Sequence, residues 1–187
     1  MKHPLRGKLV HLRPVHPGDY GLLTEWASDL ADLGLWTADR RILSHEEAVD
    51  RVIYRLQNVE LTRFMAMDNV TEEPAGTVYA YDAHPDDGYC FFTVYTMPDF
   101  VGRGHGAEAA ILMADYLFSN FSWLHKLYSD VYAYNTRSLG LNRKAGLQEE
   151  GCFKEHRFYA GQRWDMHRFA LYRCQWEEQR GSRLSVI

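Results

Sequence analysis

The chain has 187 residues, of which 46% are hydrophobic and 25% are charged, and its formal net charge is −4. This length suffices for one domain with a substantial core, whereas scattered Lys and Arg residues and the lack of a membrane-length apolar run argue against nucleic-acid and membrane binding. Three widely spaced cysteines, Cys90, Cys152 and Cys174, and nine dispersed histidines predict no disulfide framework and no metal site, so a reducing, cytoplasmic location is expected.

The first half of the sequence predicts two helices and four strands. Ser44 and Glu47 form a capping box, in which the Ser44 side chain caps the start of a helix and the Glu47 side chain reaches back to it. Residues 85–88 predict a tight turn between two strands. The expected elements are strand 9–15, helix 17–29, helix 44–56, and strands 61–67, 76–82 and 89–97.

The second half predicts a long helix that ends near residue 120, a strand, a short helix and a hairpin. The expected elements after the long helix are strand 127–134, helix 135–146, and strands 147–158 and 163–172 around a glycine turn. The polar tail, residues 175–187, is expected to fray. This order of elements predicts a single mixed α/β domain over residues 1–187, with its core at about 9–173 and one central sheet.

Residues 101–106, with the sequence VGRGHG, lie between an apolar, β-rich run and a helical run. Glycines allow the backbone to approach a ligand closely and to adopt a positive φ. The amides of such a turn and of the following helix start point at one spot, which suits a pyrophosphate. Ala107 after Gly106 excludes a Walker loop, and the third glycine comes one residue too early for a dinucleotide fingerprint.

Further motifs follow this loop in a recognisable order. They are Asn135, Ser138, the run 144–147 (KAGL), the pair at 150–151 (EG) and the hairpin 158–166 (FYAGQRWDM). With the loop, over roughly residues 9–173, the chain resembles the GNAT superfamily of acyl-CoA-dependent N-acetyltransferases, and its RimJ/RimL-type branch in particular. The resemblance implies an α/β (α+β mixed) fold, with a central, mostly antiparallel mixed sheet of about seven strands flanked by about four helices.

The resemblance also implies transfer of an acetyl group from acetyl-CoA to a primary amine, by direct attack in a ternary complex. The end of the strand before the loop then pairs with the pantetheine arm, and an amide there donates to the thioester oxygen as it becomes an oxyanion. Val101 stands where the family usually has Arg or Gln, so Arg103 and His105 are candidates to compensate. The residues expected to bind acetyl-CoA are Tyr95, Thr96, Met97, Val101, Gly102, Arg103, Gly104, His105, Gly106, Asn135, Ser138, Asn142 and Lys144.

The catalytic residues are less closely defined. Asn142 occupies the position of a Tyr proton donor in many relatives, so Ser138 is the candidate donor, with a plain role in the helix start as the alternative. The branch can carry a Glu base at the position of Arg157, and Glu155 lies two residues earlier, on the same strand face by period two. His156 is expected on the other face, and Asp165 faces this region across the hairpin, with a surface or structural role as the alternative for all three. A water chain fed by tyrosine hydroxyls, with Tyr134 as the catalytic candidate, is the alternative to a carboxylate.

The sequence leaves the acceptor amine open. Trp36, Tyr54, Tyr81 and Asp165 are the candidates to bind it, and the aromatic members favour an acceptor with a ring or an apolar face. Protein N-termini, amino sugars, polyamines and specialised metabolites are the acceptor classes considered. Two other functions stay open: a catalytically inactive CoA-binding sensor or interaction module, and an acyltransferase for a longer acyl-CoA. A homodimer is expected on the ground of the resemblance alone.

Overall fold

The computed structural model describes residues 5–28 and 43–186. The strands are β1 (Val10–Pro14), β2 (Glu60–Asp68), β3 (Pro74–His84), β4 (Tyr89–Thr96), β5 (Lys126–Tyr132), β6 (Gln148–Tyr159) and β7 (Gln162–Tyr172). The described helices are α1 (Tyr20–Ser28), α3 (His45–Asn58), α4 (His105–Asn120), α5 (Thr136–Lys144) and α6 (Arg173–Val186), and the two 3-10 turns are η1 (Pro17–Asp19) and η2 (Pro98–Phe100).

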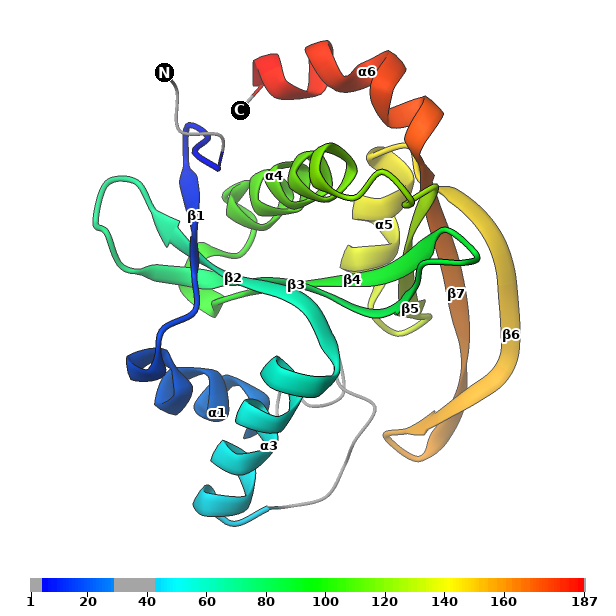
Figure 1. Cartoon of the computed structure of the whole chain (residues 1–187). Coiled ribbons are helices and arrows are strands. Elements are labelled where there is room, and N and C mark those ends of the chain that lie inside the picture. Colours follow the sequence, from blue (N-terminus) through cyan, green and yellow to red (C-terminus); the bar gives the residue numbers. More distant parts are fainter. Residues whose placement is uncertain (1–4, 29–42, 187) are drawn as a thin grey trace.

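The seven strands form one sheet in the order β1-β2-β3-β4-β5-β7-β6 (Figure 1). Within this sheet β4 and β5 are parallel, and the other neighbouring strands are antiparallel. The expected mixed, mostly antiparallel sheet of seven strands is therefore confirmed. Its central parallel pair requires a crossover, which α4 supplies.

Local sequence signals account for several element ends. At the start of α3, the Glu47 amide donates to the Ser44 hydroxyl (3.2 Å) and the Ser44 amide donates to the Glu47 carboxylate (2.8 Å), which confirms the capping box. Between β6 and β7, Ala160 and Gly161 both have positive φ (49° and 83°). Two such residues in a row make the tight turn whose twist suits a hairpin.

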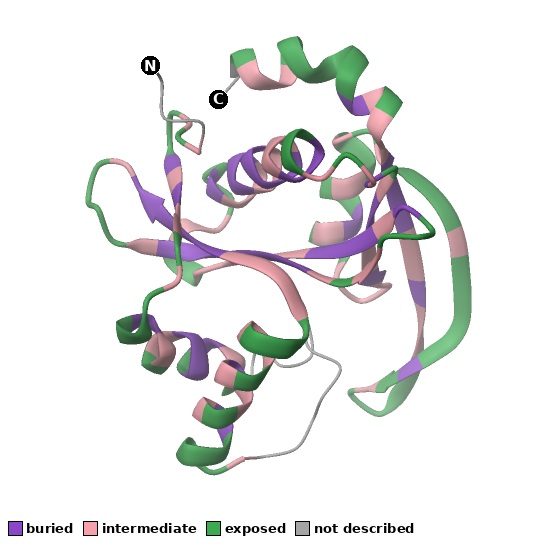
Figure 2. Cartoon of the chain, viewed as in Figure 1, coloured by how far each residue is buried: buried purple, intermediate pink, exposed green. Residues whose placement is uncertain are grey.

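Helices cover both faces of the sheet. Figure 1 shows α4 and α6 on one face and α1 and α3 on the other, and each group has its own core. The α4 side buries Leu112, Met113 and Leu117 against the strands, and the α1/α3 side buries Leu23 and Trp26. Figure 2 shows that β6, at the sheet edge, is exposed over most of its length. Among residues 5–28 and 43–186, no helix combines the length and the apolarity that a membrane span needs.

The expectation that the tail frays is wrong. Residues 173–186 form α6, a fifth helix beyond the four expected. Trp176 is only 1% exposed and belongs to the same core as α4. Arg173, at the start of α6, donates to the carbonyls of Leu124, Phe118 and Phe121 (each 2.7 Å). A buried ring and several hydrogen bonds, including those of Arg180 to Asp115, therefore hold an otherwise polar helix on the domain.

Candidate functional site

The strands β4 and β5 separate at the centre of the sheet. They pair at three positions, the last of which joins Phe91 to Tyr128. Beyond it, β4 continues along β3 as far as Thr96, while β5 continues along β7 as far as Tyr132. The ends of the two strands that do not pair with each other, residues 92–96 and 129–132, are called the β4/β5 divergence. Such a point, at the carboxyl ends of parallel strands, is where ligands bind in open sheets.

The strand register decides which amides of β4 face the divergence. The Met97 amide donates to the Ala75 carbonyl beside β3 (2.9 Å), and alternate residues of an antiparallel strand turn their amides to the same side. The Tyr95 amide therefore also faces β3, whereas the amides of Val94 and Thr96 face the divergence. Of the three residues expected to bind the pantetheine arm at the end of β4, only Thr96 has this orientation. Val94 has it too, and the sequence could not identify it without the register.

The glycine loop, residues 101–106, runs from η2 into the first turn of α4. The amides of Val101 and Arg103 donate to carbonyls of η2 (3.2 and 3.3 Å), so they serve the loop itself. The first intrahelical bond of α4 ends on the Gly104 carbonyl. Within the described part of the chain, the amides of residues 104–107 donate no backbone hydrogen bond. These four N–H groups at a helix start suit an anion.

The loop glycines are required for two different reasons. Gly102 and Gly104 have positive φ (79° and 94°), a conformation that glycine adopts without strain. At Gly106, by contrast, a Cβ would lie 2.3 Å from the Thr96 Oγ1. The first turn of α4 therefore lies directly against the end of β4, whose Val94 and Thr96 amides face the divergence. This arrangement fits the diphosphate and the amide-containing arm of CoA.

The His105 side chain does not compensate for Val101, contrary to expectation. Its Nε2 lies 2.8 Å from the Asp68 carboxylate, and its ring packs on Phe100 with 4.8 Å between centroids. Of His105, only the amide is therefore available to the expected anion site. Hydrogen bonds from the Thr71 amide and from His105 hold the pKa of Asp68 well below its usual 3.8.

We expect the Asp68 carboxylate to make stability depend on pH. Because its pKa is lower in the folded state than in the unfolded state, its contribution is complete above about pH 4 and is lost as the pH falls further. Asp68→Asn should lower the free energy of unfolding by about 2 kcal/mol at pH 7, and the difference from the native chain should shrink by roughly 1 kcal/mol per pH unit below pH 4. Urea unfolding at pH 7 and pH 3 measures both values, and an equal difference at the two pH values would contradict the assignment.

The start of α5 carries the second group of expected cofactor residues. The Asn135 side chain accepts a hydrogen bond from the Ser138 amide (3.1 Å), so it caps the helix. The Asn142 side chain donates to the Ser138 carbonyl within the same helix (3.0 Å). The structure thus brings Asn135, Ser138 and Asn142 together, in bonds that serve the helix itself.

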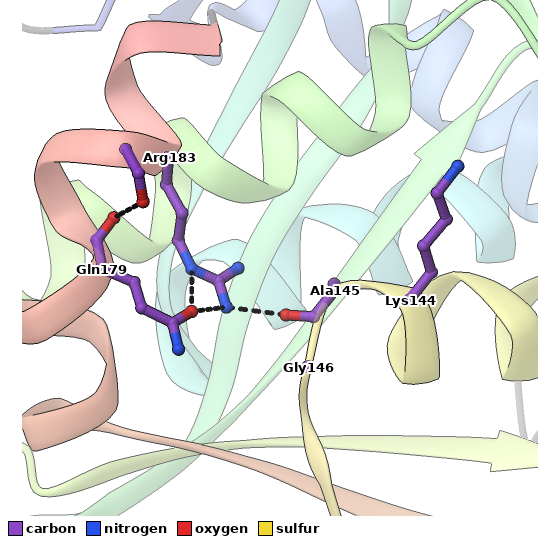
Figure 3. Close-up of a pocket in the computed structure, with 6 residues that line it drawn as sticks. Lys144, Ala145, Gly146, Gln179 and Arg183 are labelled. Atoms are coloured by element: carbon purple, nitrogen blue, oxygen red, sulfur yellow. Dashed lines mark hydrogen bonds between the residues drawn. The ribbon is translucent and has the colours of Figure 1, made fainter.

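Lys144 lies at the other end of α5, beside a cavity of about 360 Å³ between α5 and α6 (Figure 3). There Arg183 donates to the Ala145 carbonyl (2.7 Å) and to Gln179 (2.7 Å). The Lys144 side chain extends away from this pair (Figure 3). Arg183 therefore satisfies a carbonyl at the end of α5. Gly146, with φ 74°, comes directly after Ala145 and ends the helix as expected.

Tyr134 lies just beyond β5 in a cluster of aromatic rings. It stacks on Tyr132 (5.5 Å between centroids) and Tyr159 (4.5 Å) and meets the edge of Trp164 (5.5 Å). The buried guanidinium of Arg157 lies 4.8 Å from the Tyr132 ring centroid. Burial raises the pKa of Tyr134, and the charge of Arg157 opposes part of this effect. The phenol therefore keeps its proton at neutral pH.

Glu155 and Arg157 do not share a face, so the basis for choosing Glu155 as the general base is wrong. The β6–β7 register shifts between Phe153 and Arg157, and Glu155 has a positive φ of 50°. Such a bulge interrupts the alternation of a strand. The Glu155 side chain is exposed while Arg157 is buried. Asp165 accepts hydrogen bonds from the Glu155 amide (2.9 Å) and the Lys154 ammonium (2.8 Å).

The expected acceptor-binding residues lie in different places. Trp36 lies outside the described residues, and Tyr54 is 61% exposed on α3. Tyr81 is partly buried on β3, in a cluster with Phe91 and Tyr128, and burial raises its pKa to about 12. Phe91 and Tyr128 are the last paired residues of β4 and β5. A mostly buried aromatic cluster therefore lies where the two strands separate.

Comparisons with solved structures identify proteins that share this fold. Among solved structures, a spermidine N-acetyltransferase from Vibrio cholerae in complex with CoA and spermine has a TM-score of 0.81 at 22% identity, over 90% of this chain and 98% of that one. RimL, a ribosomal L7/L12 α-N-protein acetyltransferase in complex with CoA, has a TM-score of 0.74 at 14% identity, over 89% and 95%. A GNAT-family acetyltransferase from Bacillus anthracis has a TM-score of 0.73 at 18% identity, over 90% and 97%.

At these low identities, the structural similarity establishes a shared fold alone. A search of curated proteins finds no significant match. The sequence itself shows the family, because the family model of the acetyltransferase (GNAT) domain matches residues 10–148. That match includes the glycine loop, the β4/β5 divergence and the whole of α5. The chain therefore belongs to the GNAT family of acetyltransferases, in its RimJ/RimL-type branch.

Proposed function

We propose that the protein transfers an acetyl group from acetyl-CoA to a primary amine within a ternary complex. One observation carries the proposal: the first turn of α4 packs at Gly106 against the side chains of Val94 and Thr96, the two β4 residues whose amides face the divergence. Amides at a helix start bind a diphosphate, and amides at an open strand edge bind an extended arm. The two sets together suit one ligand that contains both.

In this proposal the thioester supplies the acetyl group. The residues of the chain position the two substrates and return a proton to the leaving sulfur. The amides of residues 104–107 hold the diphosphate, and an amide of Val94 or Thr96 donates to the thioester oxygen as negative charge develops on it. The amine forms its bond to the carbonyl carbon as the carbon–sulfur bond breaks. Tyr134, which holds its proton at neutral pH, returns a proton to the leaving sulfur, with Ser138 as the second candidate.

Proton removal from the amine is assigned to water beside the aromatic cluster. The Asp165 carboxylate already accepts bonds from Lys154 and from the Glu155 amide, and the Glu155 side chain is exposed. These contacts favour the water route over a carboxylate base. The half-buried rings of Tyr134, Tyr159 and Trp164, just beyond the end of β5, support an acceptor with a ring or an apolar face.

We expect Tyr134→Phe to lower kcat about tenfold and to leave the KM for acetyl-CoA unchanged. The effect is at the low end for a proton donor, because a thiolate is a stable leaving group that water can also protonate. Steady-state kinetics with saturating amine measures it, and Tyr116→Phe, on α4, is the matched control. A full rate in Tyr134→Phe with a tenfold loss in Ser138→Ala would transfer the role to Ser138.

The proposed function is tested by calorimetric titration with acetyl-CoA, followed by thiol release with a panel of amines. Because the solved neighbours are named for spermidine and for a protein N-terminus, the panel contains spermidine, a short peptide, glucosamine and an arylalkylamine. Binding with turnover supports the proposal. Binding without turnover of any amine would favour the inactive CoA-binding module, and faster turnover of a longer acyl-CoA would change the donor. Absence of binding to any CoA thioester would refute the proposal.

A further inference from the structure

We infer that His105 is a positioning residue for the glycine loop. Through its contacts with Asp68 and Phe100, it fixes the first turn of α4 in the orientation in which its amides bind the diphosphate of acetyl-CoA. The inference rests on the proposed function of the loop. It assigns to His105 a role without direct ligand contact.

The loop needs such a restraint because of its composition. Gly102, Gly104 and Gly106 alternate with other residues, and glycine gives a backbone more conformational freedom than any other residue. Phe100 comes directly before the loop, and His105 is the first residue of α4 within it. Their ring centroids are 4.8 Å apart. This contact closes residues 101–104 into a short loop with fixed ends.

Asp68 ties this closed loop to the sheet. It ends β2, and its Oδ1 accepts hydrogen bonds from the amides of Val70 (3.0 Å) and Thr71 (2.8 Å). Its Oδ2 is thereby oriented toward the His105 Nε2 at 2.8 Å. The two side chains are 10% and 8% exposed, so water hardly competes for this bond. A rigid carboxylate therefore holds the imidazole in one place.

A second anchor lies one turn further along the same helix face. The Glu108 carboxylate accepts hydrogen bonds from the amides of Leu9 (2.7 Å) and Val10 (3.0 Å) at the start of β1. Residues 105 and 108 are neighbours on a helix surface. The first turn of α4 is thus fastened on one side to β1 and β2, while residues 102–104 are exposed.

The imidazole itself is badly placed to bind an anion in solvent. Its Nδ1 is buried and has no hydrogen-bond partner among the described residues, and its Nε2 is engaged by Asp68. Removal of the ring would free the loop at its helix end. It would also leave the Oδ2 of Asp68 without its His105 partner near the amides that hold the diphosphate, where a negative charge opposes binding.

We therefore expect His105→Ala to raise the KM and the Kd for acetyl-CoA at least tenfold, with kcat within about threefold of the native value. His105→Gln, whose side-chain amide can still donate to Asp68, should recover binding to within about threefold, whereas His105→Phe, which keeps only the ring contact, should not. His84→Ala is the matched control, since His84 pairs with Asp82 (3.3 Å) at the end of β3. Its affinity should equal that of the native chain.

Two results would overturn the inference: native affinity in His105→Ala, or equal affinity in the Gln and Phe variants. A loss of thermal stability with an unchanged KM would also overturn it, because that is the effect of a purely structural contact. If His105→Ala does not fold, the comparison of the Gln and Phe variants decides. Failure of the native chain to bind acetyl-CoA would refute the proposed function instead, so the two failures are distinguishable.

Discussion

Replacement of Gly106 by Val is expected to weaken acetyl-CoA binding by at least about a hundredfold, which corresponds to roughly 2.7 kcal/mol. A Cβ at this position would lie 2.3 Å from the Thr96 Oγ1 and 3.7 Å from the Val94 Cγ1. The branched side chain of Val therefore forces the first turn of α4 away from β4. The amides proposed to hold the diphosphate are then displaced from the strand end proposed to bind the arm, so the two parts of the ligand cannot be bound together.

Calorimetric titration of the variant measures this loss, with thermal unfolding to show that it is folded. Gly181→Ala is the control, because a Cβ at Gly181 on α6 meets nothing within 4 Å. A double variant tests the cause directly. Removal of Oγ1 by Thr96→Ala should make Gly106→Ala tolerable, because the next Thr96 atom is 3.6 Å away. Native affinity in the folded Gly106→Val protein would show that the loop and β4 do not act together.

Replacement of Trp176 by Ala is expected to lower the free energy of unfolding by about 3–5 kcal/mol. Trp176 is 1% exposed, and its ring centroid lies 6.2 Å from that of Phe118. The Arg183 guanidinium lies 5.7 Å from the Trp176 ring centroid. Truncation leaves a cavity between α4 and α6 and removes the main apolar contact of a polar helix. Denaturant unfolding measures the change.

Two further variants show whether packing is the cause. Trp176→Phe should cost less than half as much as the Ala variant, because it keeps a ring in the site and removes an indole N–H that is buried without a partner among the described residues. Val70→Ala, at an 89% exposed position, should change stability by less than about 0.5 kcal/mol. A Trp176→Ala effect as small as this would mean that α6 contributes little and that the tail frays in solution.

The sequence by itself determined the features that depend on neighbouring residues. Ser44 and Glu47 mark the start of α3 because the capping contact spans three residues, and Gly146 marks the end of α5 because the next turn requires a positive φ. The order of elements and the glycine loop are local patterns of the same kind. They sufficed to predict the seven-stranded sheet and the family.

Tertiary structure alone decided which atoms these elements bring together. Asp68, 37 residues earlier in the chain, turns the His105 ring away from the loop surface, and the bulge in β6 separates the Glu155 side chain from that of Arg157. Partners in β3 determine which amides of β4 face the divergence, and the core beside α4 buries Trp176 in a segment that is otherwise polar. Each outcome depends on contacts between distant segments, whose register and packing no local pattern encodes.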